Sequence, residues 1–252
     1  MPYAFSFAQR RKEGSMEHNK LALQPRLQML ADLIPPGSVV ADIGTDHGYL
    51  PVWLLQEGRI PHAIASDINE RPLDHARQTA AEYGTADRME FRLCAGLDGF
   101  TLGEADTIVI AGMGGETIAA ILDAAPWTRA GDVRLLLQPM TKVETLRIWL
   151  SDKGYSFTEE RLVSDKDFLY PILCVRGGER RTLTAAESFA GILLEHDPLW
   201  GRYLTQQMNK LRIRIDGLKR SGSEAARGEI HRLEELYAAL AKRKEKLHEY
   251  GT

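Results

Sequence analysis

Seven short apolar runs constrain the fold of this chain most. Five of them are almost continuous in apolar residues, which is typical of strands covered on both faces in a parallel sheet: VVADI (39–43), AIASD (63–67), MEFRLC (89–94), TIVIAG (107–112) and VRLLLQP (133–139). Two more runs, 155–163 and 168–176, are close enough to pair as an antiparallel hairpin, with Pro171 favouring an edge or a bulge. Helical segments alternate with these runs, over 21–34 and from Arg71-Pro72 onward for example. The pattern predicts a doubly wound α/β domain with a seven-stranded sheet.

The character of the sequence changes after Gly177-Gly178. A capping box spans Thr184 to Glu187, and Asp197-Pro198 opens another helix. Two apolar seams then follow with the 3–4 spacing of coiled coils: Leu204, Met208, Leu211, Ile215 and Leu218, and then Ile230, Leu233, Tyr237, Leu240 and Leu247, with Lys244 at one core position. We therefore expect an extension (1–20), a Rossmann-like domain (21–178) and a helical coiled-coil hairpin (179–252).

Composition narrows the class of protein. With 252 residues, 44% hydrophobic and 27% charged, the chain is expected to be globular and soluble. A monomer or weak oligomer is expected, although composition does not determine the oligomeric state. No apolar stretch approaches the ~18 residues of a membrane span, and residues 1–15 lack the apolar core of a secretory signal. Cys94 and Cys174 match no metal or disulfide spacing, so we expect no metal site and a reducing cytoplasm. The net charge of −3 gives no overall indication of nucleic-acid binding.

The turn after the first strand, DIGTDHGYLP (42–51), carries the strongest functional signal. Nucleotide-binding turns usually have a glycine where this chain has Asp46. A carboxylate there would repel a pyrophosphate but suits S-adenosylmethionine, which has no phosphate and carries a sulfonium cation. Gly44 and Gly48 let the backbone approach a ligand, and Asp67, at the end of the second strand, is placed to accept hydrogen bonds from ribose hydroxyls.

Simpler interpretations of these residues remain open. Asp42 is also compatible with a turn or helix-cap residue, His47 with a surface histidine, and Tyr49 with plain packing on the following helix. A second signal is the strand ending in Gly112-Met113-Gly114-Gly115, because a tight turn hardly needs three glycines. Small residues at this strand end leave room for a flat base. The N/D-P-P-Y type sequence of exocyclic-amine methyltransferases is absent, which indicates a ring nitrogen as acceptor.

The combination ADIGTDHGYLP, SDIN, IAGMGGETI and LQPM resembles the bacterial tRNA (adenine-N1)-methyltransferase family TrmK. The resemblance implies a class I methyltransferase fold, S-adenosylmethionine as donor, the adenine at tRNA position 22 as acceptor, and a helical domain that helps to hold tRNA. It places the catalytic aspartate on Asp46 and the donor site at Gly44 and Asp67. From their positions in the motifs, Asp42, Gly48, Gly96, Gly112 and Met113 are further expected donor contacts. One departure is Ala95, where the family commonly has an acid; either Asp98 or backbone groups alone then contact the donor adenine.

The expected chemistry follows from the acceptor. Adenine N1 attacks the methyl group directly and the ring becomes cationic, so a carboxylate beside the base edge, Asp46, stabilises the charge as it forms. Tyr49 and His47 are expected to stack on or contact the base. Because N1 lies on the Watson–Crick edge, a paired adenine has to be opened or flipped first.

Charge is distributed unevenly along the chain. Residues 177–252 hold 14 Lys and Arg against 11 Asp and Glu, whereas residues 1–176 hold 18 against 24. The basic excess favours tRNA contact by the tail, although charged outer faces are also ordinary on helical hairpins. Two alternatives stay open: a methyltransferase for a small molecule or protein, and a catalytically degenerate methyltransferase fold that docks a protein.

Overall fold

The computed structural model describes residues 20–130, 133–221 and 224–249; the expected extension (1–20) lies outside them except for Lys20. A seven-stranded sheet has the order β3-β2-β1-β4-β5-β7-β6. Strands β1 to β5 are parallel, and β7 is antiparallel to both β5 and β6. The strands are β1 (Val39–Ile43), β2 (His62–Asp67), β3 (Met89–Leu93), β4 (Thr107–Gly114), β5 (Arg134–Thr141), β6 (Tyr155–Asp165) and β7 (Phe168–Gly177). The predicted doubly wound sheet is confirmed.

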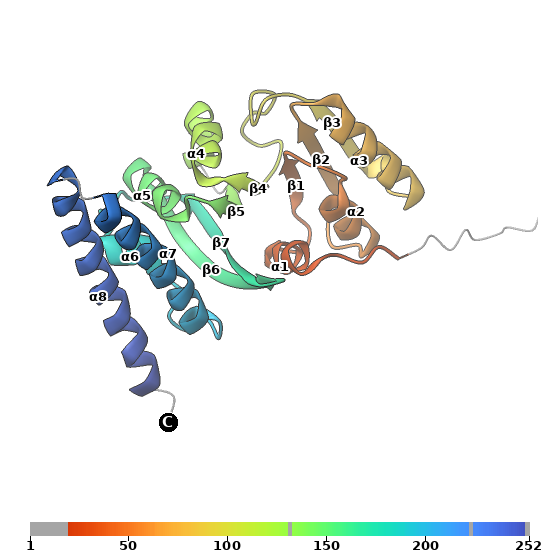
Figure 1. Cartoon of the computed structure of the whole chain (residues 1–252). Helices are drawn as coiled ribbons and strands as arrows, with labels where there is room; N and C mark the ends of the chain where they lie inside the picture. Colours follow the sequence, from red (N-terminus) through yellow and green to blue (C-terminus); the bar gives the residue numbers. More distant parts are fainter. Residues whose placement is uncertain (1–19, 131–132, 222–223, 250–252) are drawn as a thin grey trace, which may run out of the picture.

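Helices cover both faces of the sheet (Figure 1). One face packs against α1 (Pro25–Leu33), α2 (Tyr49–Gln56) and α3 (Glu70–Glu82), and the other against α4 (Gly115–Ala124) and α5 (Val143–Lys153). Alternate residues of one strand enter the two cores, as Val40 and Ala41 do. This burial on both faces explains why the parallel strands are continuous apolar runs in the sequence.

Two helix boundaries differ from the sequence-based expectation. The helix expected over 21–34 begins only at Pro25, because residues 21–24 have no helical structure, Gln24 is extended and Leu21 is buried outside any helix. The helix expected from Arg71-Pro72 begins one residue earlier, at Glu70. Proline is tolerated in a first helical turn, since the N–H groups there have no partner within the helix.

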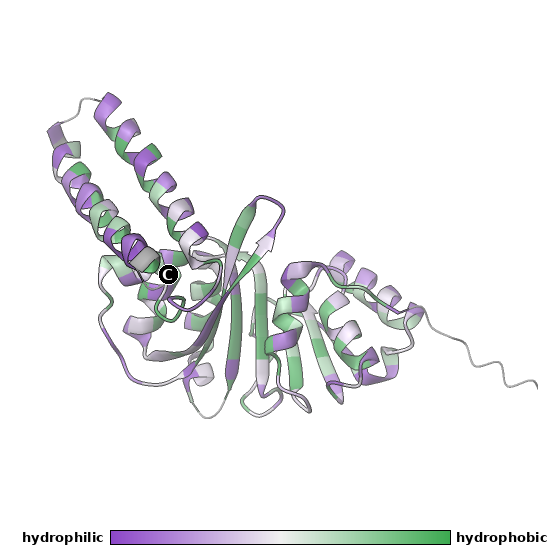
Figure 2. Ribbon diagram, turned by 90° about the horizontal axis from the view of Figure 1, so that it is seen from below, coloured by the Kyte–Doolittle hydropathy of each residue, from purple (hydrophilic) through white to green (hydrophobic). Residues whose placement is uncertain are grey.

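The C-terminal helices lie beside the β6 end of the sheet (Figure 1). They are α6 (Ala185–Ala190), α7 (Trp200–Ser221) and α8 (Arg227–Glu249), with short 3-10 turns at Ala86–Arg88, Pro126–Arg129 and Glu224–Ala226. The predicted capping box at Thr184 is present, whereas the helix expected from Asp197-Pro198 begins at Trp200. Figure 2 shows the two long helices side by side, projecting past the sheet. Their facing seam buries Leu204, Leu211, Leu233 and Leu240 in a core shared with Leu162 and Leu169 of the β6–β7 hairpin.

A buried ion pair joins the sheet to these helices. Arg147 of α5 and Glu160 of β6 are both fully buried, with Nε and Oε1 2.8 Å apart. Arg147 also donates to the Ser188 carbonyl at 2.9 Å, and Glu160 accepts the N–H groups of Ile192 and Leu193. The pair therefore fixes the start of the helical part against the α/β part. The division into domains at residue 178 stays a prediction.

Candidate active site

The strand order reverses between β1 and β4, which is where doubly wound sheets bind ligands, at the carboxyl ends of the strands. Two hollows adjoin there, and both are lined by Gly44. We call the first the apolar hollow (about 380 Å³, including Gly44, Asp67, Ala95, Gly96 and Met113). The second is the polar hollow (about 530 Å³, including Arg26, Asp42, Asp46, Tyr49 and Gln138).

Gly44 is required at the boundary between the hollows. Its φ of +73° lies in the left-handed region, and a Cβ on it would stand 2.0 Å from the Cε atom of Met113. The Met113 side chain therefore covers this glycine. A larger residue at position 44 would push into the place where the two hollows meet.

The apolar hollow has the composition of a nucleoside site. Among the described residues that line it, Asp67 and Asp98 carry the only charges, against apolar neighbours such as Ile68 and Leu97. Asp67 ends β2, and its Oδ1 accepts the Asn69 N–H at 2.7 Å. Its second carboxylate oxygen is available to a ligand. Ala95 and Asp98 both line this hollow, so a carboxylate is present beside the departure at Ala95.

The polar hollow gathers the residues of the DIGTDHGYLP turn. Asp46 is 81% exposed and its Oδ2 lies 3.6 Å from His47 Nε2, which is longer than a hydrogen bond. The carboxylate therefore keeps its acceptor sites for another group. The His47 ring stacks with the rings of Tyr49 (centroids 5.1 Å apart) and of His75 from α3 (4.7 Å apart). These contacts set the plane of the His47 ring, and Tyr49 remains 40% exposed.

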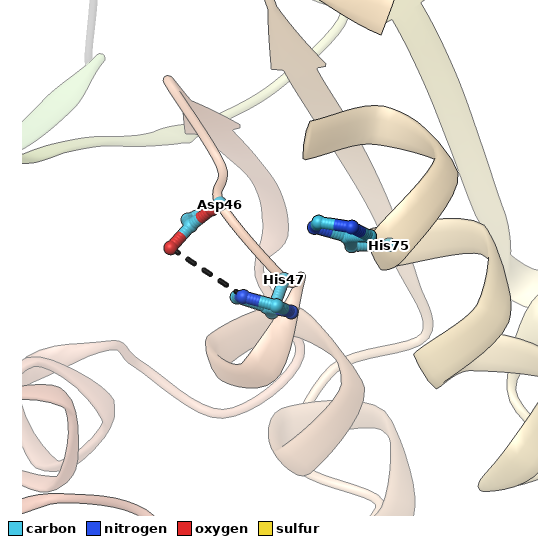
Figure 3. A group of neighbouring side chains, drawn as sticks. All are labelled: Asp46, His47 and His75. Atoms are coloured by element: carbon cyan, nitrogen blue, oxygen red, sulfur yellow. Dashed lines mark ion pairs between the residues drawn. The ribbon is translucent and has the colours of Figure 1, made fainter. Parts of the chain in front are cut away.

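Asp46, His47 and His75 bring three potential metal ligands within 4.8 Å of one another (Figure 3). The two imidazole planes are only 8° from parallel. A ring nitrogen binds a metal through a lone pair in the ring plane, and lone pairs of stacked rings do not converge on one ion. The geometry favours a stack of rings over a metal centre, and the expectation of a reaction without metal stays a prediction.

Asp42 is a buried carboxyl at the edge of the polar hollow. Burial raises its pKa from 3.8 to about 6, the Thr45 hydroxyl opposes this rise, and the negative charge of Asp67 adds to it. A cation bound nearby would favour the ionised form. The position therefore suits a positively charged ligand.

Arg26 and Gln138 belong to the polar hollow but were not predicted from the sequence. Arg26 donates from Nε to Asp165 at 2.7 Å and from an η-nitrogen to Gln138 Oε1 at 3.3 Å. Its guanidinium also lies over the Tyr170 ring, 5.5 Å from the centroid. A polar residue that ends the apolar run VRLLLQP was the available signal for Gln138, whereas nothing local marks Arg26.

Every residue predicted for the site lines one of the two hollows. Gly44, Asp67, Gly96 and Met113 line the apolar hollow. The polar hollow is lined by Gly44 again and by Asp42, Asp46, His47, Gly48, Tyr49 and Gly112. The roles assigned to these residues remain predictions.

Comparison with known proteins identifies the family of this fold. A family model described as a methyltransferase domain matches residues 23–173. The chain is 36% identical over 191 residues to the tRNA (adenine(22)-N(1))-methyltransferase of Bacillus subtilis (strain 168), which covers 76% of this chain and 78% of that protein.

Solved structures give the same result. The B. subtilis m1A22 tRNA methyltransferase TrmK superposes with a TM-score of 0.80 at 29% identity, covering 89% of this chain and 99% of that one. A Streptococcus pneumoniae protein in complex with S-adenosyl-L-methionine has a TM-score of 0.76 at 30% identity, covering 88% of this chain and 100% of that one. The fold is thus shared with these structures.

Proposed function

The chain belongs to the tRNA (adenine(22)-N(1))-methyltransferase family, and on that premise we propose that it transfers a methyl group from S-adenosylmethionine to N1 of adenine 22 in tRNA. The resemblance found in the sequence motifs is confirmed. The observation that carries the proposal is that the two hollows meet at Gly44. The apolar hollow, with the composition of a nucleoside site, therefore adjoins the polar hollow, where the Asp46 carboxylate is available.

S-adenosylmethionine is the donor, and it supplies a methyl group made electrophilic by the sulfonium. Its adenosine suits the apolar hollow, where Asp67 would accept from the ribose hydroxyls and Asp98 would lie near the adenine. Its cationic end would lie toward Asp42 and Gly44, at the boundary with the polar hollow. These residues thus bind and orient the donor.

The target adenine would enter the polar hollow. N1 forms a bond to the methyl carbon as the sulfur–carbon bond breaks, and positive charge passes from the sulfonium to the adenine ring. Asp46 would accept from the exocyclic amine and stabilise that charge, while the exposed Tyr49 ring would lie against the base. We assign no proton transfer to His47, whose stacked ring holds the shape of the turn.

Asp67→Ala is expected to weaken donor binding by ~1 to 3 kcal/mol, because ribose hydroxyls lose their acceptor in a half-buried site. Titration calorimetry with S-adenosylmethionine measures the loss. Asp98→Ala tests the adenine end separately. An unchanged dissociation constant for the Asp67 variant would remove this residue from the donor site.

Asp42→Asn is expected to stabilise the ligand-free protein at neutral pH. The folded chain holds the Asp42 proton with a pKa of about 6, above the ordinary 3.8, so this residue lowers the free energy of unfolding as pH rises between those values. The total amounts to ~3 kcal/mol at neutral pH and vanishes below about pH 4. Urea unfolding of both proteins across this pH range measures the difference. Equal stabilities at neutral pH would show that the ionised carboxyl is not destabilised by burial.

The helical tail (179–252) is proposed to contact tRNA. A tRNA substrate also favours the cytoplasm as the location of the protein. None of the helices among the described residues is both long and apolar enough to cross a membrane. Not all of the basic residues of the tail are available, because Arg214 and Lys219 pair with Glu229 and Glu234 of the opposite helix. Contact with RNA is therefore expected from the unpaired cations.

Reverse transcription tests the proposed function, since a methyl group on N1 blocks base pairing. The protein is incubated with S-adenosylmethionine and unmodified tRNA, and stops are mapped. We expect one stop at adenine 22, lost when that nucleotide is replaced. Methylation of a small molecule or protein without a tRNA stop would favour the alternative methyltransferase function, and no transfer at all would favour the docking module.

A further inference from the structure

A third hollow lies between the tip of the β6–β7 hairpin and the first half of α7. It has a volume of about 450 Å³, and we call it the hairpin hollow; it includes Phe168, Arg202, Gln206, Asn209, Lys210 and Ile213. Phe168 is 59% exposed and Ile213 is 69% exposed, so two large apolar side chains face solvent beside two cations. Asp167 is the one carboxylate among the described lining residues.

Gln206 holds together the two elements that form this hollow, α7 and the β6–β7 hairpin. Its Oε1 accepts the Leu169 N–H at 3.1 Å, and its Nε2 donates to the Leu169 carbonyl at 3.2 Å. This pair of hydrogen bonds ties α7 to the chain immediately after Phe168. The aromatic ring is thus presented from a fixed backbone, which lowers the entropy cost of binding against it.

The two cations of this hollow, Arg202 and Lys210, differ from other cations of α7 in their pairing with carboxylates. Arg214 and Lys219 pair with glutamates across the helical hairpin. In the described part of the chain no carboxylate lies within 4.0 Å of the Arg202 or Lys210 side-chain nitrogens. The Glu144 carboxylate acts on the Lys210 charge from beyond that distance, but neither cation is held in a close ion pair by a carboxylate of the described residues, so both can contact phosphates.

The hairpin hollow lies at the same edge of the sheet as the site for the target base. β6 is parallel to β5 through their shared neighbour β7, so the hairpin tip lies at the same edge of the sheet as the carboxyl ends of the parallel strands. Asp165 at the tip holds Arg26 of the polar hollow, and the residues that follow line the hairpin hollow. The Arg26–Asp165 contact thus links the polar hollow to the hairpin tip.

We propose that the hairpin hollow binds a second nucleotide of the tRNA strand that carries the target adenine. Its base stacks on Phe168 and Ile213, and the adjacent phosphates contact Arg202 and Lys210. An exposed aromatic ring flanked by unpaired cations is the combination with which proteins bind unstacked RNA. This inference rests on the proposed function, since it takes tRNA as the substrate.

The test compares tRNA binding by full-length variants over a range of salt concentrations. Arg202→Gln with Lys210→Gln is expected to weaken binding about tenfold or more and to reduce the slope of log Kd against log salt by about 1.5. Phe168→Ala is expected to weaken binding roughly tenfold, whereas Phe168→Tyr keeps the ring and binds like the unchanged protein. The matched control, Arg212→Gln with Arg220→Gln, removes two charges from the same helix outside the hollow.

Affinity for S-adenosylmethionine should stay unchanged in every variant and serves as the folding control. Equal losses in the hollow and control pairs would assign RNA to the whole basic face and overturn the inference, as would unchanged tRNA binding by Phe168→Ala. If the hollow docks a protein instead, all the hollow variants should bind tRNA as tightly as the unchanged chain, and this result would also overturn the inference. Failure of the proposed function has a separate measurement: the unchanged protein would then give no reverse-transcription stop at adenine 22.

Discussion

Asp46→Asn is expected to lower the turnover of tRNA methylation ~100-fold or more while changing donor affinity little. The amide keeps the shape of the side chain but loses the negative charge that offsets the adenine cation as it forms. In the free protein Asp46 is 81% exposed, so water screens its charge. Once the base covers the polar hollow that water is displaced, and the carboxylate acts on the base at short range.

Single-turnover methylation at saturating tRNA and donor measures this effect, with calorimetry for donor binding. Asp87→Asn is the matched control, because Asp87 is 80% exposed and lies outside the lining of both hollows. Turnover within a few-fold of the unchanged protein would reduce Asp46 to a residue that shapes the turn. A similar loss in both variants would indicate a general effect of surface charge.

The parts of this molecule that could be predicted from sequence are those that short segments encode. β1 was predicted at its observed bounds, Val39–Ile43, because a strand buried on both faces is a continuous apolar run. Asp46, His47 and Tyr49 lie on one turn, so their meeting in one hollow follows from the turn itself. The helix expected over 21–34 is longer than the observed one, because Leu21 is apolar for burial in a segment without regular structure.

What could not be predicted depends on contacts between distant segments. Arg26 reaches Gln138 and Asp165, which lie 112 and 139 residues away along the chain. The hairpin hollow likewise needs Phe168 and Lys210 on one surface. The sequence predicts a basic excess in the tail, but only the packing of α7 on α8 decides which of these residues pair with glutamates.

Glu160→Leu is expected to be the most destabilising of the substitutions considered, lowering the free energy of unfolding by ~3 to 5 kcal/mol. It leaves the fully buried Arg147 guanidinium without its counter-charge and the N–H groups of Ile192 and Leu193 without their acceptor. For a chain of this length the melting temperature should fall by ~2 to 4 °C for each kcal/mol. Urea unfolding and thermal melting measure both quantities.

The double variant Arg147→Met with Glu160→Leu separates the buried charge from the lost hydrogen bonds. It should recover part of the loss, because no uncompensated charge remains, but not all of it, since the two N–H groups stay without an acceptor and the Ser188 carbonyl loses its donor. Glu229→Gln, which breaks the exposed pair with Arg214, is the control and should change stability by less than ~1 kcal/mol. Because Glu160 holds the segment that leads into α7, and Arg147 donates to the Tyr203 hydroxyl of α7 at 3.3 Å, Glu160→Leu should also weaken tRNA binding more than donor binding. Equal stability of the Glu160 and Glu229 variants would mean that the interior pair is solvated like a surface one, and that the apolar core around Leu204 and Leu240 alone holds the helices to the sheet.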